Sequence, residues 1–169
     1  MVHSGNSFAL AYGDKIIGNV NTNDNASMNY NKGNRFKAGL IDFSGNLFIG
    51  SIPQSLSGLG VIFPFFTTAY QGWIGGIVSV DNSHQSRLKK TKSALYYSIV
   101  ILLQFIPYSL TIGAGLALGI KTYKLNKNRK LFEYRLDKSG LKDLFNIYLL
   151  AIPMFFFASC FEFLSNWNI

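Results

Sequence analysis

Three long stretches of the chain are almost free of charged residues, and no other feature of the sequence constrains the fold as much. Residues 38–80 contain a single charge, Asp42; residues 93–120 contain none; and residues 144–169 contain one, Glu162. A transmembrane helix needs about 20 consecutive, mostly apolar residues. Each stretch is therefore long enough to supply at least one membrane-spanning helix.

The alternative is a soluble helical bundle with very apolar helices. A helix on the surface of a soluble protein shows a polar face at 3.6-residue spacing, and residues 94–103 show no such face. Charged residues make up 14% of the chain, against about 25% in an ordinary soluble domain. All four prolines also lie inside the apolar stretches, a position that membrane helices tolerate better than soluble ones. We therefore predict an all-α, polytopic transmembrane helical bundle.

The lengths of the stretches predict three to four spans. Residues 38–80 would extend about 65 Å as one helix, roughly twice the hydrocarbon thickness of a bilayer. We expect two spans there, near 38–58 and 61–80, separated by a Gly-containing turn at residues 57–60. The last stretch supplies one span, near 144–164.

The middle stretch has two interpretations. At about 40 Å, residues 94–120 are long for one span and short for two. The segment either crosses the membrane once as a tilted helix, or dips in and returns with a break at Pro107. The sequence leaves both possibilities open.

All 16 basic residues fall in three segments: the amino-terminal region up to Lys37, the loop 81–92 and the loop 121–143. The last loop carries eight of them, so the positive-inside rule predicts that it is cytoplasmic and that the carboxyl terminus is extracytoplasmic. A single span at 94–120 then leaves the other two segments outside, against the rule, whereas a re-entrant segment brings all three inside. The side of the amino-terminal arm stays open, and we predict a multi-pass protein of the cell membrane.

We divide the chain into a polar amino-terminal arm, residues 1–36, and a transmembrane domain, residues 37–169. The arm holds eight asparagines. Asparagine favours turns over helix interiors, so we expect irregular structure in the arm.

Small and uncharged polar residues inside the spans are the candidate packing contacts. A buried amide in hydrocarbon must find a hydrogen-bonding partner, so we expect Asn46 and Gln104 to bond between helices. Two small-xxx-small patterns are of the kind that lets helices approach closely. They are Gly72-x-x-x-Gly76 and Gly115-x-x-x-Gly119.

The two carboxylates in the apolar stretches lie near predicted span ends. Asp42 and Glu162 can reach the interface, or they can act in an ion pair with a partner subunit or in a proton-coupled site. We take Glu162 as the candidate for a polar contact between subunits. The histidines, His3 and His84, have no cysteine or carboxylate at ligand spacing, so we predict no catalytic, metal or cofactor site. The basic residues flank apolar spans, which argues against nucleic-acid binding.

The order of these features from Gly39 to Leu164 resembles the stage II sporulation protein M family of integral membrane proteins. Asn46 stands near the start of a long Gly-broken apolar stretch, as in that family. Gln104 lies within the next hydrophobic segment, before the small-residue run 113–119, and a charged connector leads to a last span that ends near Glu162. Family members typically have Glu where Gln104 stands, and they usually carry an additional amino-terminal span.

The resemblance implies an interaction role, because the sporulation member is similar to a scaffold that holds peptidoglycan-degrading partners at the engulfing septum. We therefore expect a non-enzymatic membrane scaffold or accessory subunit that holds other integral membrane proteins in a hetero-complex, surrounded by membrane lipids. The alternative is a small transporter or channel component that acts as an oligomer, because broken helices can expose backbone groups to a substrate near the midplane.

Overall fold

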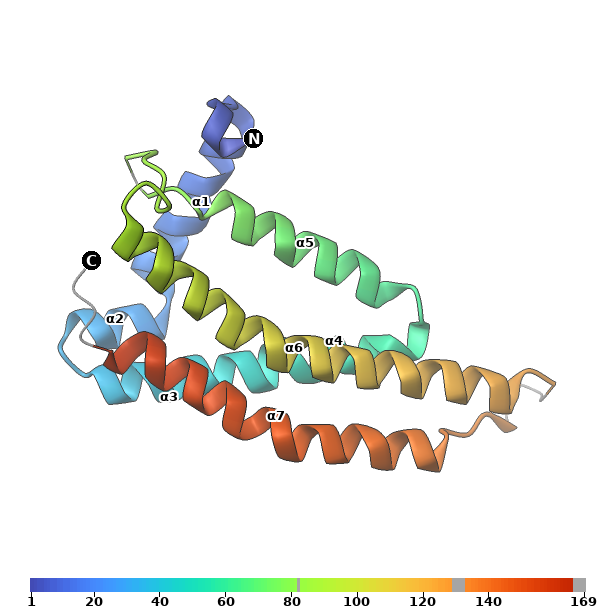
Figure 1. Cartoon of the computed structure of the whole chain (residues 1–169). Helices are drawn as coiled ribbons and strands as arrows, with labels where there is room; N and C mark the ends of the chain where they lie inside the picture. Colours follow the sequence, from blue (N-terminus) through green and yellow to red (C-terminus); the bar gives the residue numbers. More distant parts are fainter. Residues whose placement is uncertain (82, 129–132, 166–169) are drawn as a thin grey trace.

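The computed structural model describes residues 1–81, 83–128 and 133–165, and there the chain consists of helices joined by turns and loops (Figure 1), with an isolated β-bridge between Val80 and Ser86. The predicted all-α class is confirmed. The elements are η1 (Val2–Ser4), α1 (Ser7–Asn23), α2 (Asn25–Asn31), α3 (Arg35–Ser44), the π-helical segment η2 (Gly45–Ser51), α4 (Ile52–Ser57), the 3-10 turn η3 (Gly58–Gly60), α5 (Phe63–Ile77), α6 (Thr91–Asn126) and α7 (Lys138–Leu164).

Three long elements form the bundle. Helices α6 and α7 run antiparallel along each other, and the helical run from α3 to η3 packs against both (Figure 1). Helix α5 diverges from this group after the chain reverses, and α1 crosses one end of the molecule near the carboxyl end of α5. Fully buried side chains such as Phe155 and Leu118 mark the contact between the long helices.

Two helices are long and apolar enough to cross a membrane. Helix α6 has 36 residues and α7 has 27, or about 54 Å and about 40 Å at 1.5 Å per residue. Helix α6 extends beyond the predicted span 94–120 at both ends, whereas α7 begins before the predicted span 144–164 and ends with it at Leu164, because the helices continue into polar residues at those three ends. The connector between them is correspondingly shorter than the predicted loop 121–143. Residues 129–132 of that loop, and 166–169 of the predicted domain, lie outside the described part of the chain.

The predicted possibility of a re-entrant break at Pro107 is wrong. Helix α6 continues through Pro107, which is itself fully buried. A proline removes one backbone hydrogen bond from a helix, but packing against neighbouring helices can hold the helix together across it. Residues 94–120 therefore form one continuous helix. Pro153 lies inside α7 in the same way.

The pair of spans predicted between residues 38 and 80 is not confirmed, because the helices there are interrupted or short. The run from Arg35 to Gly60 is helical throughout but changes from α to π and back, and it ends in a 3-10 turn. The chain then reverses at Val61 and Ile62, just after the expected turn. Helix α5 has 15 residues, about 22 Å, which is shorter than the roughly 30 Å hydrocarbon core. Pro64 fixes its first turn, and the bridge at Val80 follows its end.

The expectation of irregular structure in the arm is wrong, because residues 1–36 contain α1 and α2. Ala9 of α1 is fully buried in a cluster with Ile77 and Val80, and the ring of Tyr12 lies 4.9 Å from that of Trp73. Asp24 caps α2 by accepting a hydrogen bond of 2.7 Å from the backbone N–H of Ser27. These tertiary contacts and the cap outweigh the weak helix propensity of asparagine.

Candidate functional site: a polar seam and two cavities

Helix α6 lies directly against the backbone of α4 and η3 at its glycines. A Cβ atom on Gly115 would overlap with the carbonyl group of Ser55, and one on Gly119 would overlap with the carbonyl group of Gly58. Conversely, a Cβ on Gly58 would overlap with the backbone of Gly115. Only glycine permits this approach. The structure therefore places both predicted glycines of α6 in an intramolecular helix contact.

Hydroxyl groups join the three long elements beside this contact. Ser51 Oγ donates to Thr111 Oγ1 of α6 at 2.8 Å. The hydroxyl of Tyr148 on α7 lies 3.1 Å from Ser51 Oγ and 2.8 Å from Ser55 Oγ. Ser51, Ser55 and Thr111 are fully buried. One Tyr hydroxyl thus holds α7 to two serines that face it from consecutive turns.

Asn46 takes part in a second set of hydrogen bonds, which lies next to the first set along the bundle. The hydroxyl of Tyr108 on α6 donates to Asn46 Oδ1 at 2.9 Å, and Asn46 Nδ2 donates to Asp42 Oδ2 at 2.9 Å. The same Asp42 oxygen accepts a bond of 2.7 Å from Ser159 Oγ on α7. The ring of Tyr108 also packs edge-on against Phe155, with ring centroids 4.9 Å apart.

Gln104 and Glu162 form the third set. Gln104 Nε2 on α6 donates to Glu162 Oε2 on α7 at 2.6 Å, and the hydroxyl of Tyr96 donates to the Glu162 backbone carbonyl at 2.9 Å. The three sets make a polar seam along the inside of the bundle. It comprises Asp42, Asn46, Ser51, Ser55, Gln104, Tyr108, Thr111, Tyr148, Ser159 and Glu162.

Gly72 and Gly76 are not part of this seam. A Cβ atom on Gly72, Gly75 or Gly76 of α5 would meet nothing within 4 Å. These glycines instead line an open cavity of about 810 Å³ between α5 and α6, opposite Ile101 and Phe105. The Gly72-x-x-x-Gly76 pattern therefore has no packing role between described helices of the chain. The face of α5 that carries these glycines is open to a further helix.

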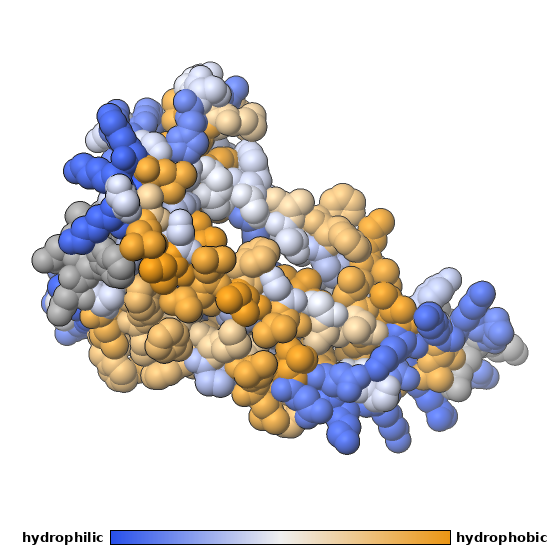
Figure 2. All heavy atoms as spheres, viewed as in Figure 1, coloured by the Kyte–Doolittle hydropathy of each residue, from blue (hydrophilic) through white to orange (hydrophobic). Residues whose placement is uncertain are grey.

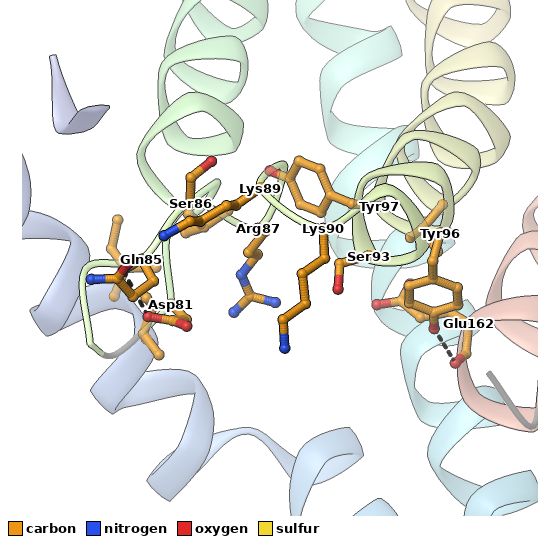
Figure 3. A pocket seen from close by; sticks show the side chains of 14 residues that line it. Asp81, Gln85, Ser86, Arg87, Lys89, Lys90, Ser93, Tyr96, Tyr97 and Glu162 are labelled. Carbon is orange, nitrogen blue, oxygen red and sulfur yellow. Dashed lines mark hydrogen bonds between the residues drawn. The ribbon is translucent and has the colours of Figure 1, made fainter. Parts of the chain in front are cut away.

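A second cavity, of about 1020 Å³, lies at the end of the bundle where α6 begins. Its wall is formed by α1, the 78–90 loop, the first turns of α6 and Glu162 of α7. Figure 3 shows the side chains of Arg87 and Lys90 pointing into the same open space, between Asp81 on one side and Tyr96 with Glu162 on the other. We call this the basic cavity.

The two carboxylates of the basic cavity are engaged by other groups. Asp81 Oδ1 accepts backbone N–H bonds from Gln85 at 2.9 Å and Ser83 at 2.8 Å. These bonds, the one from Gln85 first, lower the pKa of Asp81, so it is a carboxylate at neutral pH. Glu162 accepts from Gln104, as described above. The ion pairs between described residues are His84–Asp14 and Lys121–Asp143, so neither Arg87 nor its neighbours Lys89 and Lys90 belong to one there.

The surface is divided along the long axis of the bundle. Figure 2 shows hydrophilic residues at both ends of the visible face, over the loop before α6 and over the turn between α6 and α7, with hydrophobic residues between them. Large apolar side chains are exposed in this middle region, including Leu102 at 57%, Phe145 at 63% and Leu149 at 61%.

Comparisons with protein families, with curated proteins and with solved structures found nothing that matches the chain. The resemblance to the stage II sporulation protein M family therefore stays a prediction. No group of three or more His, Cys, Asp or Glu that could hold a metal ion is found in residues 1–81, 83–128 and 133–165.

Sequence reasoning missed most of the seam's hydroxyl groups. The buried residues of α6 include Thr111, Gly115, Leu118 and Thr122, which lie three or four apart, and Ser51 and Ser55 are also four apart. That spacing of small and hydroxyl residues places them on one helix face. This spacing could have predicted which face of the helix packs against other helices. It does not identify the partner residues, which lie far away in the chain.

Proposed function

We propose that this protein spans a membrane and acts there as a non-enzymatic scaffold or accessory subunit that binds a helix of another membrane protein. The low burial of the two long helices supports the membrane part of the proposal. The most apolar 18-residue windows of α6 and α7 are only 17% and 28% buried within the molecule, whereas the core helix of a soluble protein is mostly buried. Exposed apolar surface on this scale is unfavourable in water.

The scaffold part rests chiefly on the open glycine face of α5. Gly72, Gly75 and Gly76 line the same cavity, and none has a neighbour at its Cβ position. In membranes, faces of small residues allow a second helix to approach closely enough for extensive van der Waals contact. A helix of a partner, laid between α5 and α6, would cover these glycines together with Ile101 and Phe105.

The seam supports packing rather than transport. The hydrogen-bonding groups of Asn46, Ser51, Tyr108 and Tyr148 bond to one another across three helices, and these four residues do not line either of the two cavities. A substrate pathway needs polar groups that face open space. The arrangement of these residues therefore favours a role in helix packing over a role in a substrate pathway.

We further propose that the connector between α6 and α7 faces the cytoplasm and that the carboxyl terminus lies on the opposite side. The connector region holds eight basic residues within residues 121–142, more than any other single loop of the chain. The other eight lie in the arm and in the loop before α6, at the other end of the bundle. The two ends thus carry equal numbers of basic residues, and the positive-inside rule favours this orientation because the connector is the single loop with the most of them.

Co-purification from a mild detergent tests the scaffold function. We expect the wild type to retain a defined membrane partner at fixed stoichiometry, and Gly72→Leu or Gly76→Leu to lose it while the thermal midpoint of the purified chain stays unchanged. Gly113→Leu is the matched control, because it also meets open space but lies on α6 away from the glycine face. Retention of the partner by both α5 variants would refute the proposed surface. Solute transport by the chain reconstituted alone would instead establish the transporter alternative.

A further inference from the structure

The basic cavity combines a large volume with a wall that is cationic in one part and apolar in another. Its volume of about 1020 Å³ is at the upper end of the range for small-molecule sites. Its wall has a cationic part, from Arg87, Lys89 and Lys90, and an apolar part that includes Ile16, Ile17 and Val100. A ligand that fits such a wall carries an anionic group beside an apolar body.

The cations of this cavity are oriented toward its interior. Arg87 Nε donates to the Val80 backbone carbonyl at 3.4 Å, which fixes the side chain close to the bridge between Val80 and Ser86. Figure 3 shows its guanidinium group and the Lys90 ammonium group directed into one space. A guanidinium fork and an ammonium group are the side-chain groups that bind phosphate oxygens best.

The negative charges in the cavity offset its cations only in part. The acids in its wall are Asp81 and Glu162, and each already accepts a hydrogen bond from a described residue. Three cations in the wall therefore exceed two carboxylates by one positive charge. The first turn of α6, which begins beside the cavity, contains no acidic residue, and its backbone N–H groups add to the positive potential.

We propose that the basic cavity binds a phosphate-bearing amphiphile whose head carries a net negative charge, with the phosphate between Arg87 and Lys90 and the apolar body against Ile16, Ile17 and Val100. The tyrosines Tyr96 and Tyr97 also line this cavity, and tyrosine is typical of the level of lipid headgroups in a bilayer. The inference rests on the membrane part of the proposed function and is independent of the scaffold part.

Binding to the full chain in a non-ionic detergent that contains no phosphate tests this inference. The probes are phosphatidylglycerol, phosphatidylcholine and glycerol 3-phosphate, which carry respectively an anionic head with chains, a zwitterionic head with chains, and the head alone. Dissociation constants are measured by native mass spectrometry or by the ligand-induced shift of the thermal midpoint. We expect phosphatidylglycerol to bind at least tenfold more tightly than either of the other two.

Two pairs of substitutions locate the site. Arg87→Gln with Lys90→Gln should weaken phosphatidylglycerol binding at least tenfold. Lys124→Gln with Lys127→Gln removes the same charge at the other end of the bundle and should leave binding unchanged. Lys90→Gln alone, which breaks no hydrogen bond seen between described residues, should weaken binding at least threefold with unchanged helicity.

Three results would overturn the inference. They are an equal loss of affinity in both double variants, an absence of preference for phosphatidylglycerol over phosphatidylcholine, and glycerol 3-phosphate binding as tight as that of the lipid. The last result would identify a soluble phosphate as the ligand. Failure of the scaffold function would be seen separately, as loss of the partner protein while lipid binding persists.

Discussion

Gly119 of α6 lies so close to the carbonyl group of Gly58 that any side chain at position 119 would overlap with it. The same relationship holds one turn earlier between Gly115 and Ser55. Because the clash is with backbone, which cannot turn aside as a flexible side chain can, these contacts set the distance between α6 and the α4–η3 segment.

Two alanine substitutions on α6 distinguish the steric cost of this close contact from the general effect of replacing glycine with alanine in a helix. Gly115→Ala should lower the free energy of unfolding by about 1–3 kcal/mol, the usual cost of an overpacked site. Gly113→Ala, two residues earlier in the same helix, meets open space and should raise stability by about 0.5–1 kcal/mol, because alanine restricts the unfolded chain. Thermal or denaturant unfolding in detergent measures both. Equal effects of the two substitutions would contradict the close approach.

The hydroxyl of Tyr148 is the next test, since it joins α7 to two buried serines. Tyr148→Phe removes only this oxygen and should destabilise the chain by about 0.6–2 kcal/mol, the range for hydrogen bonds between membrane helices. Tyr123→Phe is the control, because the Tyr123 side chain is exposed and its loss of an oxygen should change nothing measurable. A Tyr148→Phe variant as stable as the wild type would argue against the seam as a stabilising element.

The start of α7 predicts a dependence on pH. Asp137 accepts hydrogen bonds from the backbone N–H of Gly140 at 2.7 Å and from Ser139 Oγ at 2.8 Å, and these bonds lower its pKa below the ordinary value of 3.8. A carboxyl group with a lowered pKa in the folded state stabilises the fold above the unfolded pKa, and that contribution is lost as the pH falls through the folded value.

Asp137→Asn keeps a capping oxygen but cannot titrate. Unfolding followed by circular dichroism between about pH 6 and pH 2 should therefore show a smaller loss of stability in the variant than in the wild type. Parallel curves for the two proteins would mean that Asp137 does not contribute to the acid sensitivity.

The general fold was accessible from the sequence because the apolar stretches mark which residues avoid water. They predicted a single helix in the region of α7. For residues 94–120 they left a continuous helix as one of two possibilities, and they did not give the ends of either helix. Helix α7 starts at Lys138, six residues before the predicted span, because the cap at Asp137 and not the edge of the apolar stretch determines where the helix begins.

The site was less accessible, and for a physical reason. Asn46 and Gln104 could be chosen because a buried amide needs partners, yet their partners lie far away in the chain. Tyr108 is 62 residues from Asn46, and Ser159 is 117 residues from Asp42. The π-helical segment Gly45–Ser51 also changes which residues share a helix face. No local sequence pattern predicted this segment. Gly72 and Gly76 show that the glycine spacing alone does not predict a contact. They are four residues apart, as Gly115 and Gly119 of α6 are, but no other helix in the described part of the chain packs at their Cβ positions.

Labelling of single cysteines tests the orientation, after Cys160 has been replaced by serine. Residues Ser83 and Asn128 lie at opposite ends of α6. A membrane-impermeant maleimide applied to intact cells should label a cysteine at position 83 and spare one at position 128. Labelling of position 128 alone would reverse the proposed orientation, and labelling of both would contradict a span between them.

Alkaline carbonate extraction of membranes from cells that express the full chain addresses the central proposal most directly, because it removes proteins that are held only at the surface. If lipid surrounds α6 and α7, the protein remains in the membrane pellet and enters solution only with detergent. Release into the supernatant, followed by monodisperse behaviour in buffer without any amphiphile, would contradict the membrane proposal and the functions built on it.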